Sequence, residues 1–496
     1  MTAARSGDWY DTASGGVRGS MAWLQFAALV GIASIGFFWL GRGLPRIAWL
    51  ASDSDSYLQF SPVRPHGYSL FLAAYRAVFD DFAHLPTVQL GLYISAVFLL
   101  AVAIRRRTQS FLLAAVILIV VLVGTDTTNF PYLLSDSVYA AAVTAGIACV
   151  VLYAGTRRAY LVLLAGVGLG LAVTFRAIGL ALLPALFIAL LAAELGQPGR
   201  LGRRFIVTWA LAALPVAVLY CGAASSQLVH NGRFALGSWG GMDVLGKIPL
   251  LSRPVPANSE FTHLNGVIET MQPARDKLRE LSPLVEALAA RQYYDHLRWY
   301  VIVPELDRSW PEWRQADTYR QGQLAAKLAF AYVAEDPLGF VRRTVLDLAG
   351  LWAMPRWLTE REQKVAQEGI DRLGELPFLS QFSQTEEGRL GYYKIIPDPV
   401  DPAGVILFRV VVAGFWIFSL GFAALLLRRD RMALLLRTPE LVLILLAVHA
   451  SYLGTALMEG VYERYIMPTW PLLVAGPVLA LALIRRPAAQ FIRRRP

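Results

Sequence analysis

The chain has 496 residues, of which 56% are hydrophobic and only 17% are charged. This composition is too apolar for a soluble protein of such length, and it predicts a polytopic membrane protein. The formal net charge of +10 could suit a nucleic-acid-binding protein, but the basic residues stand in small groups at the ends of apolar runs, where they set membrane topology. We therefore expect no nucleic-acid partner.

Hydropathy predicts an all-α fold, a helical bundle of about ten transmembrane helices. The predicted spans are residues 21–40, 87–104, 110–124, 134–154, 160–175, 177–195, 205–224, 404–427, 439–458 and 466–484. The first run lacks a clear small-residue cleavage site, so we expect a retained span rather than a signal peptide. Arginine groups occupy every second connection, which predicts that these connections and both termini are cytoplasmic.

These spans divide the chain into three parts. Residues 1–224 form an N-terminal transmembrane module whose first outer connection is 41–86. Residues 225–403 form an insertion that we expect outside the cytoplasm, and 404–496 form a C-terminal transmembrane module with a basic cytoplasmic tail. The topology therefore places the insertion and the first outer connection on the same side of the membrane.

The insertion is predicted to be a small helical cap, because it shows no run of alternating strands. A Ser-Pro pair at 282–283 and an Asp-Pro pair at 336–337 each mark the start of a helix. The second helix carries Arg342, Arg343 and Asp347 on one side. That pattern is typical of a helix lying at a membrane surface.

The usual signatures of soluble enzymes are absent from the sequence, including His-Glu-x-x-His, Cys-x-x-Cys and Gly-x-Ser-x-Gly. Gly246-Lys247 lacks the glycine spacing of a phosphate loop, and Lys247 is retained only as a candidate substrate-binding cation. Gly166, Gly168 and Gly170 lie within a predicted span. They predict close helix packing rather than a nucleotide site.

Polar residues gather in the connections that the topology places outside the cytoplasm. They are Asp53, Asp55, Asp126, Asp136, Arg176, Glu459, Glu463, Arg464 and Tyr465. If these connections converge, a carboxylate could take a proton from an acceptor hydroxyl while cations stabilise a departing phosphate. The pattern therefore predicts a transfer reaction that releases a phosphate.

The order of these motifs resembles the GT-C superfamily of membrane glycosyltransferases, which includes protein O-mannosyltransferases and the lipid A aminoarabinose transferase. The matching motifs are Asp53-Ser54-x-x-Tyr57, Arg64-Pro65-x-Gly67-Tyr68, Ser135-Asp136, Thr174-Phe175-Arg176 and Glu463-Arg464-Tyr465. One departure is Phe175, where related chains often have an arginine directly after the threonine. The similarity covers the first seven spans and returns before the last.

The resemblance implies a bacterial inner-membrane enzyme of glycan biosynthesis in the cell envelope. Its partners would be a polyprenyl-phosphate-linked sugar donor, membrane lipids and an extracytoplasmic acceptor hydroxyl on a glycan, a lipid or a protein. The catalytic candidates are Asp53, Asp55 and Asp136. The substrate-binding candidates are Tyr57, Arg64, His66, Tyr68, Arg176, Lys247, Glu463, Arg464 and Tyr465.

We prefer Asp53 to Asp55 as the base, because on a helical turn Asp53 shares a face with Tyr57. No cofactor is implied with certainty. A divalent cation between Asp53 and Asp136 stays open, because carboxylate oxygens suit such ions but no spacing selects one.

Simpler roles compete with several of these assignments. Asp136 could cap a helix, Arg176 could reach the membrane interface from a helix end, and Arg464 could form an ion pair with a neighbouring glutamate. Arg64 and His66 could only shape their turn.

Two other functions remain open from the sequence. A transporter or flippase of lipid-linked sugars would need charges near mid-membrane and paired repeats, and the sequence shows neither. A polymerase or ligase of surface polysaccharide would need several arginines in a large outer loop. The predicted insertion contains such arginines.

Overall fold

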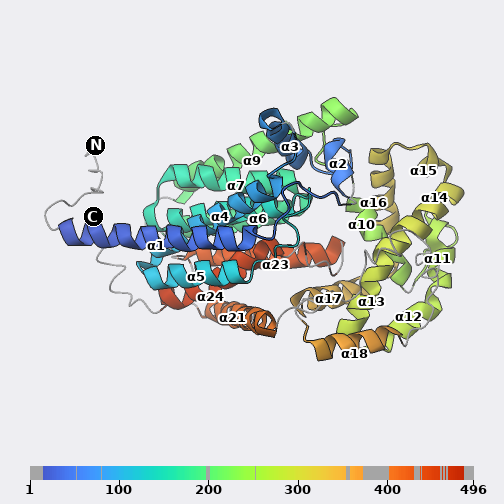
Figure 1. Cartoon of the computed structure of the whole chain (residues 1–496). Helices are drawn as coiled ribbons and strands as arrows, with labels where there is room; N and C mark the ends of the chain where they lie inside the picture. Colours follow the sequence, from blue (N-terminus) through green and yellow to red (C-terminus); the bar gives the residue numbers. More distant parts are fainter. Residues whose placement is uncertain are drawn as a thin grey trace.

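The computed structural model describes residues 15–51, 53–79, 81–196, 201–238, 240–251, 253–353, 358–371, 402–428, 436, 438–458, 461, 464 and 467–484. In this part of the chain the structure is all-helical, and the only β contacts are two isolated bridges. The helices form an elongated bundle with a lobe of shorter helices at one end (Figure 1).

Long apolar helices build the bundle. They are α1 (Gly15–Gly41), α4 (Leu85–Thr108), α5 (Phe111–Val123), α6 (Asp136–Thr156), α7 (Ala159–Phe175), α8 (Leu182–Leu195), α9 (Leu201–Asn231), α21 (Pro402–Leu426), α23 (Pro439–Met458) and α24 (Trp470–Ile484). Seven helical segments of the described chain are long and apolar enough to cross a membrane, and three further apolar helices are shorter. The protein is therefore a helical membrane protein.

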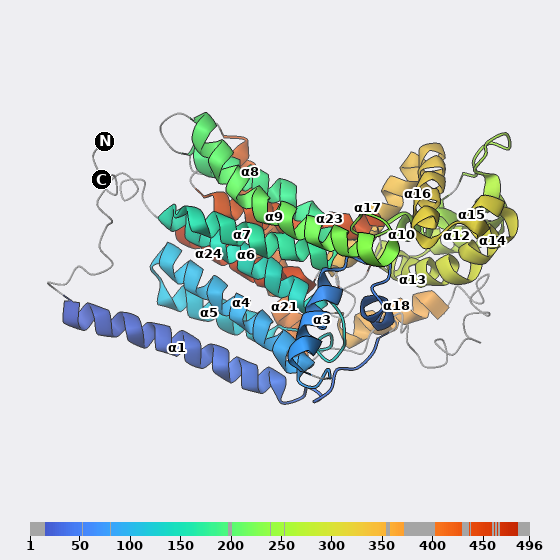
Figure 2. The same ribbon diagram turned by 90° about the horizontal axis from the view of Figure 1, so that it is seen from above.

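The buried share of each helix shows which helices lie at the centre of the bundle and which lie at its edge. The apolar stretch of α6 is 83% buried, whereas those of α1 and α9 are only 11% buried. Figure 2 shows α1 and α9 on opposite edges of the bundle, with α4, α6 and α7 between them. Exposed apolar side chains on the outer helices are typical of surfaces that face lipid.

Three glycines of α7 permit the close packing at this centre. A Cβ atom at Gly168 would lie 2.8 Å from the backbone of Gly146 on α6. Gly166 and Gly170 instead face the backbone of α9, where a Cβ would meet Ala212 or Val216. The prediction that these glycines bring helices close together is confirmed.

The lobe consists of short helices around their own apolar core. They are α10 (Gly240–Leu245), α11 (Asn265–Thr270), α12 (Gln272–Arg279), α13 (Pro283–His296), α14 (Val303–Ser309), α15 (Pro311–Gln315), α16 (Thr318–Glu335), α17 (Pro337–Ala353) and α18 (Glu360–Asp371). The prediction that the insertion is helical is confirmed for its described residues, and α13 and α17 begin at the two predicted prolines. Trp313 and Tyr332 are among the largest side chains of the lobe core.

The lobe is joined to the bundle through α17. Trp352 on this helix stacks on Tyr452 of α23, with ring centroids 4.0 Å apart. The three charged residues of α17 do not share one exposed side as predicted. Arg343 and Asp347 are buried, whereas Arg342 is exposed together with Leu338, Val341 and Val345. Two short helices, α2 (Ser54–Leu58) and α3 (Gly67–Val78), lie at the same end of the bundle (Figure 1).

Candidate functional site

The first connection of the chain is fastened to the start of α6. Ser54 donates a hydrogen bond from its hydroxyl to the Leu133 carbonyl at 3.0 Å. The hydroxyls of Tyr57 and Ser135 lie 2.9 Å apart, within hydrogen-bond distance. These contacts hold α2, and with it Asp53 at its start, beside the N-terminal end of α6.

The turn after α2 is held by the end of α9. Gln227 donates to the Arg64 carbonyl at 2.8 Å, and the two ring nitrogens of His66 lie 3.0 Å from the Ser226 hydroxyl and 3.3 Å from the Asn231 amide. His66 is fully buried, and burial lowers its pKa. A buried, neutral His66 supports the simpler assignment that it shapes the turn.

Two further motifs of the sequence meet at the start of α3. A Cβ atom on Gly67 would clash with the backbone carbonyl of Thr174, so only glycine permits this approach. Tyr68 is buried, donates to the Gln89 amide oxygen at 2.9 Å and packs edge-on against Tyr57. Tyr57 and Tyr68 therefore lie inside the wall that supports Asp53.

Asp53 is the point where the separate segments meet. Its two carboxylate oxygens accept from Arg64 at 2.8 Å and from Arg464 at 2.9 Å, and its side chain is 21% exposed. Although it stands at the N-cap position of α2, the side chain makes no capping bond. Asp55 is exposed and has no ion pair with any described residue, which supports the preference for Asp53.

The charge of Asp53 is stabilised by its surroundings. Burial raises its pKa, but the guanidinium groups of Arg64 and Arg464, with a smaller contribution from Arg176, outweigh burial and hold the pKa below its usual value. Asp53 is therefore ionised at neutral pH. Only two of the roughly four acceptor positions of a carboxylate are occupied by these arginines.

A second ion pair lies beside the first. Asp136 is the first residue of α6 and accepts from Arg176, which follows α7 in an extended conformation. Both side chains are buried, so this pair is more than a surface contact. The structure thus brings together Asp53, Asp136, Arg176 and Arg464, four residues from four separate connections.

A small open pocket lies at this cluster. Arg464 and Asp136 lie in its wall together with Asp126, Asn129, Ser137 and apolar residues that include Met467. The Ser137 hydroxyl is buried and has no hydrogen-bond partner among the residues that the structure describes. No sequence signal pointed to Ser137 or Asn129, because neither belongs to a motif.

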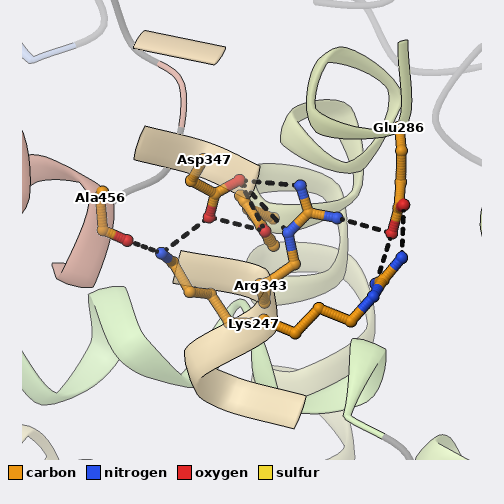
Figure 3. A network of polar contacts seen from close by, with 7 residues as sticks. Lys247, Glu286, Arg343, Asp347 and Ala456 are labelled. Carbon is orange, nitrogen blue, oxygen red and sulfur yellow. Dashed lines mark hydrogen bonds and ion pairs between the residues drawn. The ribbon is translucent and has the colours of Figure 1, made fainter. Parts of the chain in front are cut away.

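Lys247 lies elsewhere, in a buried network between the lobe and the bundle (Figure 3). Its ammonium donates to Asp347 of α17 at 2.9 Å and to the carbonyl of Ala456 at the end of α23. Both charged side chains are fully buried, and Tyr294 also donates to Asp347 at 3.0 Å. The contacts of Lys247 therefore join the lobe to the bundle, and its role in substrate binding stays a prediction.

Two predicted site residues, Glu463 and Tyr465, lie outside the described residues. Within the described ranges, no group of three or more His, Cys, Asp or Glu side chains is placed to hold a metal ion. Asp53 and Asp136 are each paired with an arginine. The divalent cation stays a prediction.

Taken together, these features define a helical membrane protein with a charged pocket at the end of its bundle that faces the lobe. No protein-family model matches the chain, and no curated protein or solved structure matches it either.

Proposed function

We propose that the chain is an integral membrane glycosyltransferase of the GT-C type. It transfers a sugar from a polyprenyl-phosphate donor to the hydroxyl of a glycan, lipid or protein acceptor, with inversion at the anomeric carbon. The observation that carries the proposal is the position of Asp53, which is held by Arg64 and Arg464 next to the pocket that Arg464 and Asp136 line.

The proposed topology has ten spans, with the three shorter apolar helices crossing the membrane as well. α4 has 24 residues, and at 1.5 Å per residue it is about 36 Å long, enough to separate two membrane faces. It ends in Arg105, Arg106 and Arg107, at the opposite end from Asp53. We assign the arginine end to the cytoplasm, and the pocket and the lobe to the other side.

In the proposed reaction, the polyprenyl tail of the donor stays in lipid and its phosphate enters the pocket. Asp53 accepts the proton of the acceptor hydroxyl as that oxygen forms a bond to the anomeric carbon. The bond between this carbon and the phosphate oxygen breaks, and polyprenyl phosphate leaves with the electron pair. The products are an inverted glycoside, a protonated Asp53 and the lipid phosphate.

The arginines have two roles in this scheme. Arg464 lines the pocket and bonds Asp53, so it is placed to stabilise the negative charge that develops on the departing phosphate. Arg176 lies beside it, paired with Asp136. Arg64 bonds the other carboxylate oxygen of Asp53, and we assign it the positioning of that carboxylate.

The proposal is tested by incubating purified protein with polyprenyl-phosphate hexose and pentose donors and a cell-envelope extract as the acceptor, and by measuring released polyprenyl phosphate. Removal of a catalytic base costs about 10²-fold to 10⁴-fold in rate, so Asp53→Asn should lose at least 99% of the release, about 10²-fold. Asp55→Asn changes the neighbouring exposed carboxylate and should behave as wild type.

Retained release in Asp53→Asn would exclude Asp53 as the base. A wild-type protein that releases no polyprenyl phosphate but moves the lipid-linked sugar across vesicles would identify a flippase instead.

A further inference from the structure

Arg464 stands in a connection whose two ends contact different parts of the molecule. Residues 459–466 follow α23, and the short helix η8 (Met467–Thr469) comes after them. Within this connection the structure describes Val461 and Arg464. η8 packs against α6, and its Pro468 is buried. The chain that follows Arg464 is therefore fixed to the bundle.

The chain that precedes Arg464 contacts the lobe instead, through Val461. This side chain is fully buried. A Cβ atom on Gly350 of α17 would lie 2.7 Å from one γ-carbon of Val461 and 3.3 Å from the other. The same atom would lie 3.1 Å from the Cβ of Ala287 on α13. Because Gly350 has no side chain, Val461 can fill this space against α17.

A second contact with the lobe lies just before this connection, at the end of α23 (Figure 3). The ammonium of Lys247 donates to the Ala456 carbonyl in the last turn of this helix and to Asp347 of α17, the latter at 2.9 Å. The last carbonyls of a helix have no partner within the helix, so such a bond fixes the helix end. The lobe thus holds the chain at Ala456 and again at Val461.

Asp53, the partner of Arg464, is held by the bundle. Its helix α2 is bonded to Leu133 and Ser135, just before α6. Arg464 donates to Asp53 at 2.9 Å and lines the pocket beside it. The ion pair therefore joins a carboxylate fixed to α6 with a guanidinium whose chain contacts the lobe three residues earlier, at Val461. Three residues reach at most about 11 Å, so little of a shift at Val461 can be absorbed before Arg464.

We infer that Val461 is a positioning residue for Arg464, and that its contact with Gly350 lets the packing of the lobe set the ion pair between Arg464 and Asp53. The pocket wall, in the part of the chain that the structure describes, contains no residue of the lobe. The lobe therefore acts on the pocket through Arg464 and not by direct contact. The inference concerns the position of Arg464, and it rests on the proposed function only for the ligand, polyprenyl phosphate.

Gly350→Ala tests this contact most directly. Carbon atoms of separate groups normally lie about 3.5–4.0 Å apart, so the added methyl group forces Val461 to move by about 1 Å. Valine is stiff about its first side-chain torsion, and Val461 is fully buried, so we expect its backbone to move as well. Misplacement of a site residue by about 1 Å can cost about 10²-fold in rate. Gly350→Ala should therefore lower polyprenyl-phosphate release by at least about tenfold.

Further variants complete the design. Val461→Ala removes both γ-carbons and should loosen the connection, whereas the double variant Gly350→Ala/Val461→Ala gives the new methyl group room and should recover. Gly266→Ala is the matched control, because Gly266 lies in the lobe helix α11 and a Cβ there would meet no atom within 4 Å. Each full-length protein, with and without Arg464→Gln, is unfolded by heat in detergent. The shift of the midpoint that Arg464→Gln causes measures how well Arg464 pairs with Asp53.

Arg464→Gln should shift the midpoint fully in the wild type, in Gly266→Ala and in the double variant, and by about half or less in each single variant. An equal shift in all of these proteins would overturn the inference, because a merely structural contact lowers stability without changing the pairing of Arg464. If Gly350→Ala does not fold, Val461→Ala and the double variant are compared in the same way.

The midpoint shift does not depend on catalysis. A wild-type protein that releases no polyprenyl phosphate but shows the expected pattern of shifts would contradict the proposed function and support the positioning role of Val461. Release at the wild-type rate in Gly350→Ala, together with an unchanged shift, would overturn that role.

Discussion

Asp53 shows how a carboxylate can be kept both charged and accessible. Its partner Arg64 comes from the same connection and Arg464 from a distant part of the sequence, and each bonds a different carboxylate oxygen. A carboxylate whose pKa is lowered is a weaker base, but it is fully ionised at neutral pH, as the proposed proton transfer requires. The two arginines thus favour the ionised form of Asp53 and lower its basicity.

The lowered pKa of Asp53 makes a prediction about stability and pH. The folded protein binds a proton at Asp53 less readily than the unfolded chain, so the ion pairs contribute fully above the unfolded pKa of about 3.9 and are lost as the pH falls through the lower folded value. Asp53→Asn should therefore lower the unfolding midpoint at pH 7, and its difference from the wild type should begin to shrink below about pH 4 and vanish only below the lower folded pKa.

Thermal unfolding in detergent across this pH range checks the prediction. Asp55→Asn serves as the control, because Asp55 is exposed and should show no difference at any pH. A deficit in Asp53→Asn that stayed the same down to pH 3 would rule out the ion pairs as its cause.

A substitution at Asp136 can show whether this residue only caps a helix or stabilises the protein through its ion pair with Arg176. Asparagine caps helices as well as aspartate does, so Asp136→Asn should be harmless if capping is its only role. Since Asp136 is buried with Arg176, we instead expect a loss of about 3 kcal/mol in stability and a large drop in transfer. Unfolding midpoints and polyprenyl-phosphate release measure the two effects, and a fully stable, active variant would favour the capping role.

From the sequence, these polar residues could be assigned to one side of the membrane. Which of them form ion pairs with each other could not be predicted. The shared face of Asp53 and Tyr57 followed from local helical spacing. The bond from Arg64 depends on the path of the turn after α2, and the bond from Arg464 depends on how distant segments fold together. Ser137 carried no motif at all. Lys247 had nothing in its local sequence to show that both of its partners would come from other helices.

At the scale of helices, Gly168 on α7 and Gly222 on α9 differ in what surrounds them, which gives a matched pair of substitutions. Gly168→Ala would place a methyl group 2.8 Å from the backbone of Gly146, so helices α6 and α7 would have to separate. A methyl group at Gly222 on α9 would meet no atom within 4 Å, and Gly222→Ala should leave stability unchanged or slightly raised.

Unfolding midpoints in detergent compare the two glycine variants. The expected order is Gly168→Ala below the wild type and Gly222→Ala at or above it, with transfer reduced only in the first. Similar midpoints for both variants would show that the α6–α7 contact is not tightly packed.

Local sequence signals predicted where helices begin, but they did not predict which side of a helix is buried. Proline and its preceding residue marked the starts of α13 and α17, because proline is favoured in the first turn of a helix. The same helix pattern could not show which side of α17 would be buried. Arg343 and Asp347 are inside because Glu286 and Lys247, from other segments, neutralise them there.

For the whole molecule, hydropathy identified the apolar helices, since each run is a property of the local sequence. It could not give the order of packing, in which α6 is central and α1 and α9 are peripheral. It also gave no sign of the network at Asp347, through which the lobe contacts α23.

The proposed orientation predicts which surface positions a membrane-impermeant thiol reagent can reach. With Cys149 and Cys221 replaced by serine, Asp55→Cys should react in intact cells, whereas Arg106→Cys should react only after permeabilisation. Both positions are exposed and lie at opposite ends of the bundle. Labelling of Arg106→Cys in intact cells would reverse the assigned orientation.

The central claim is that connections distant in the sequence form one site for a lipid phosphate beside Asp53. Cryo-electron microscopy of the full chain in nanodiscs containing a polyprenyl phosphate tests it most directly. We predict phosphate density within hydrogen-bond distance of Arg464, in the pocket that Asp136 lines. Phosphate density found only elsewhere on the protein, with the pocket at Asp136 empty, would contradict the claim.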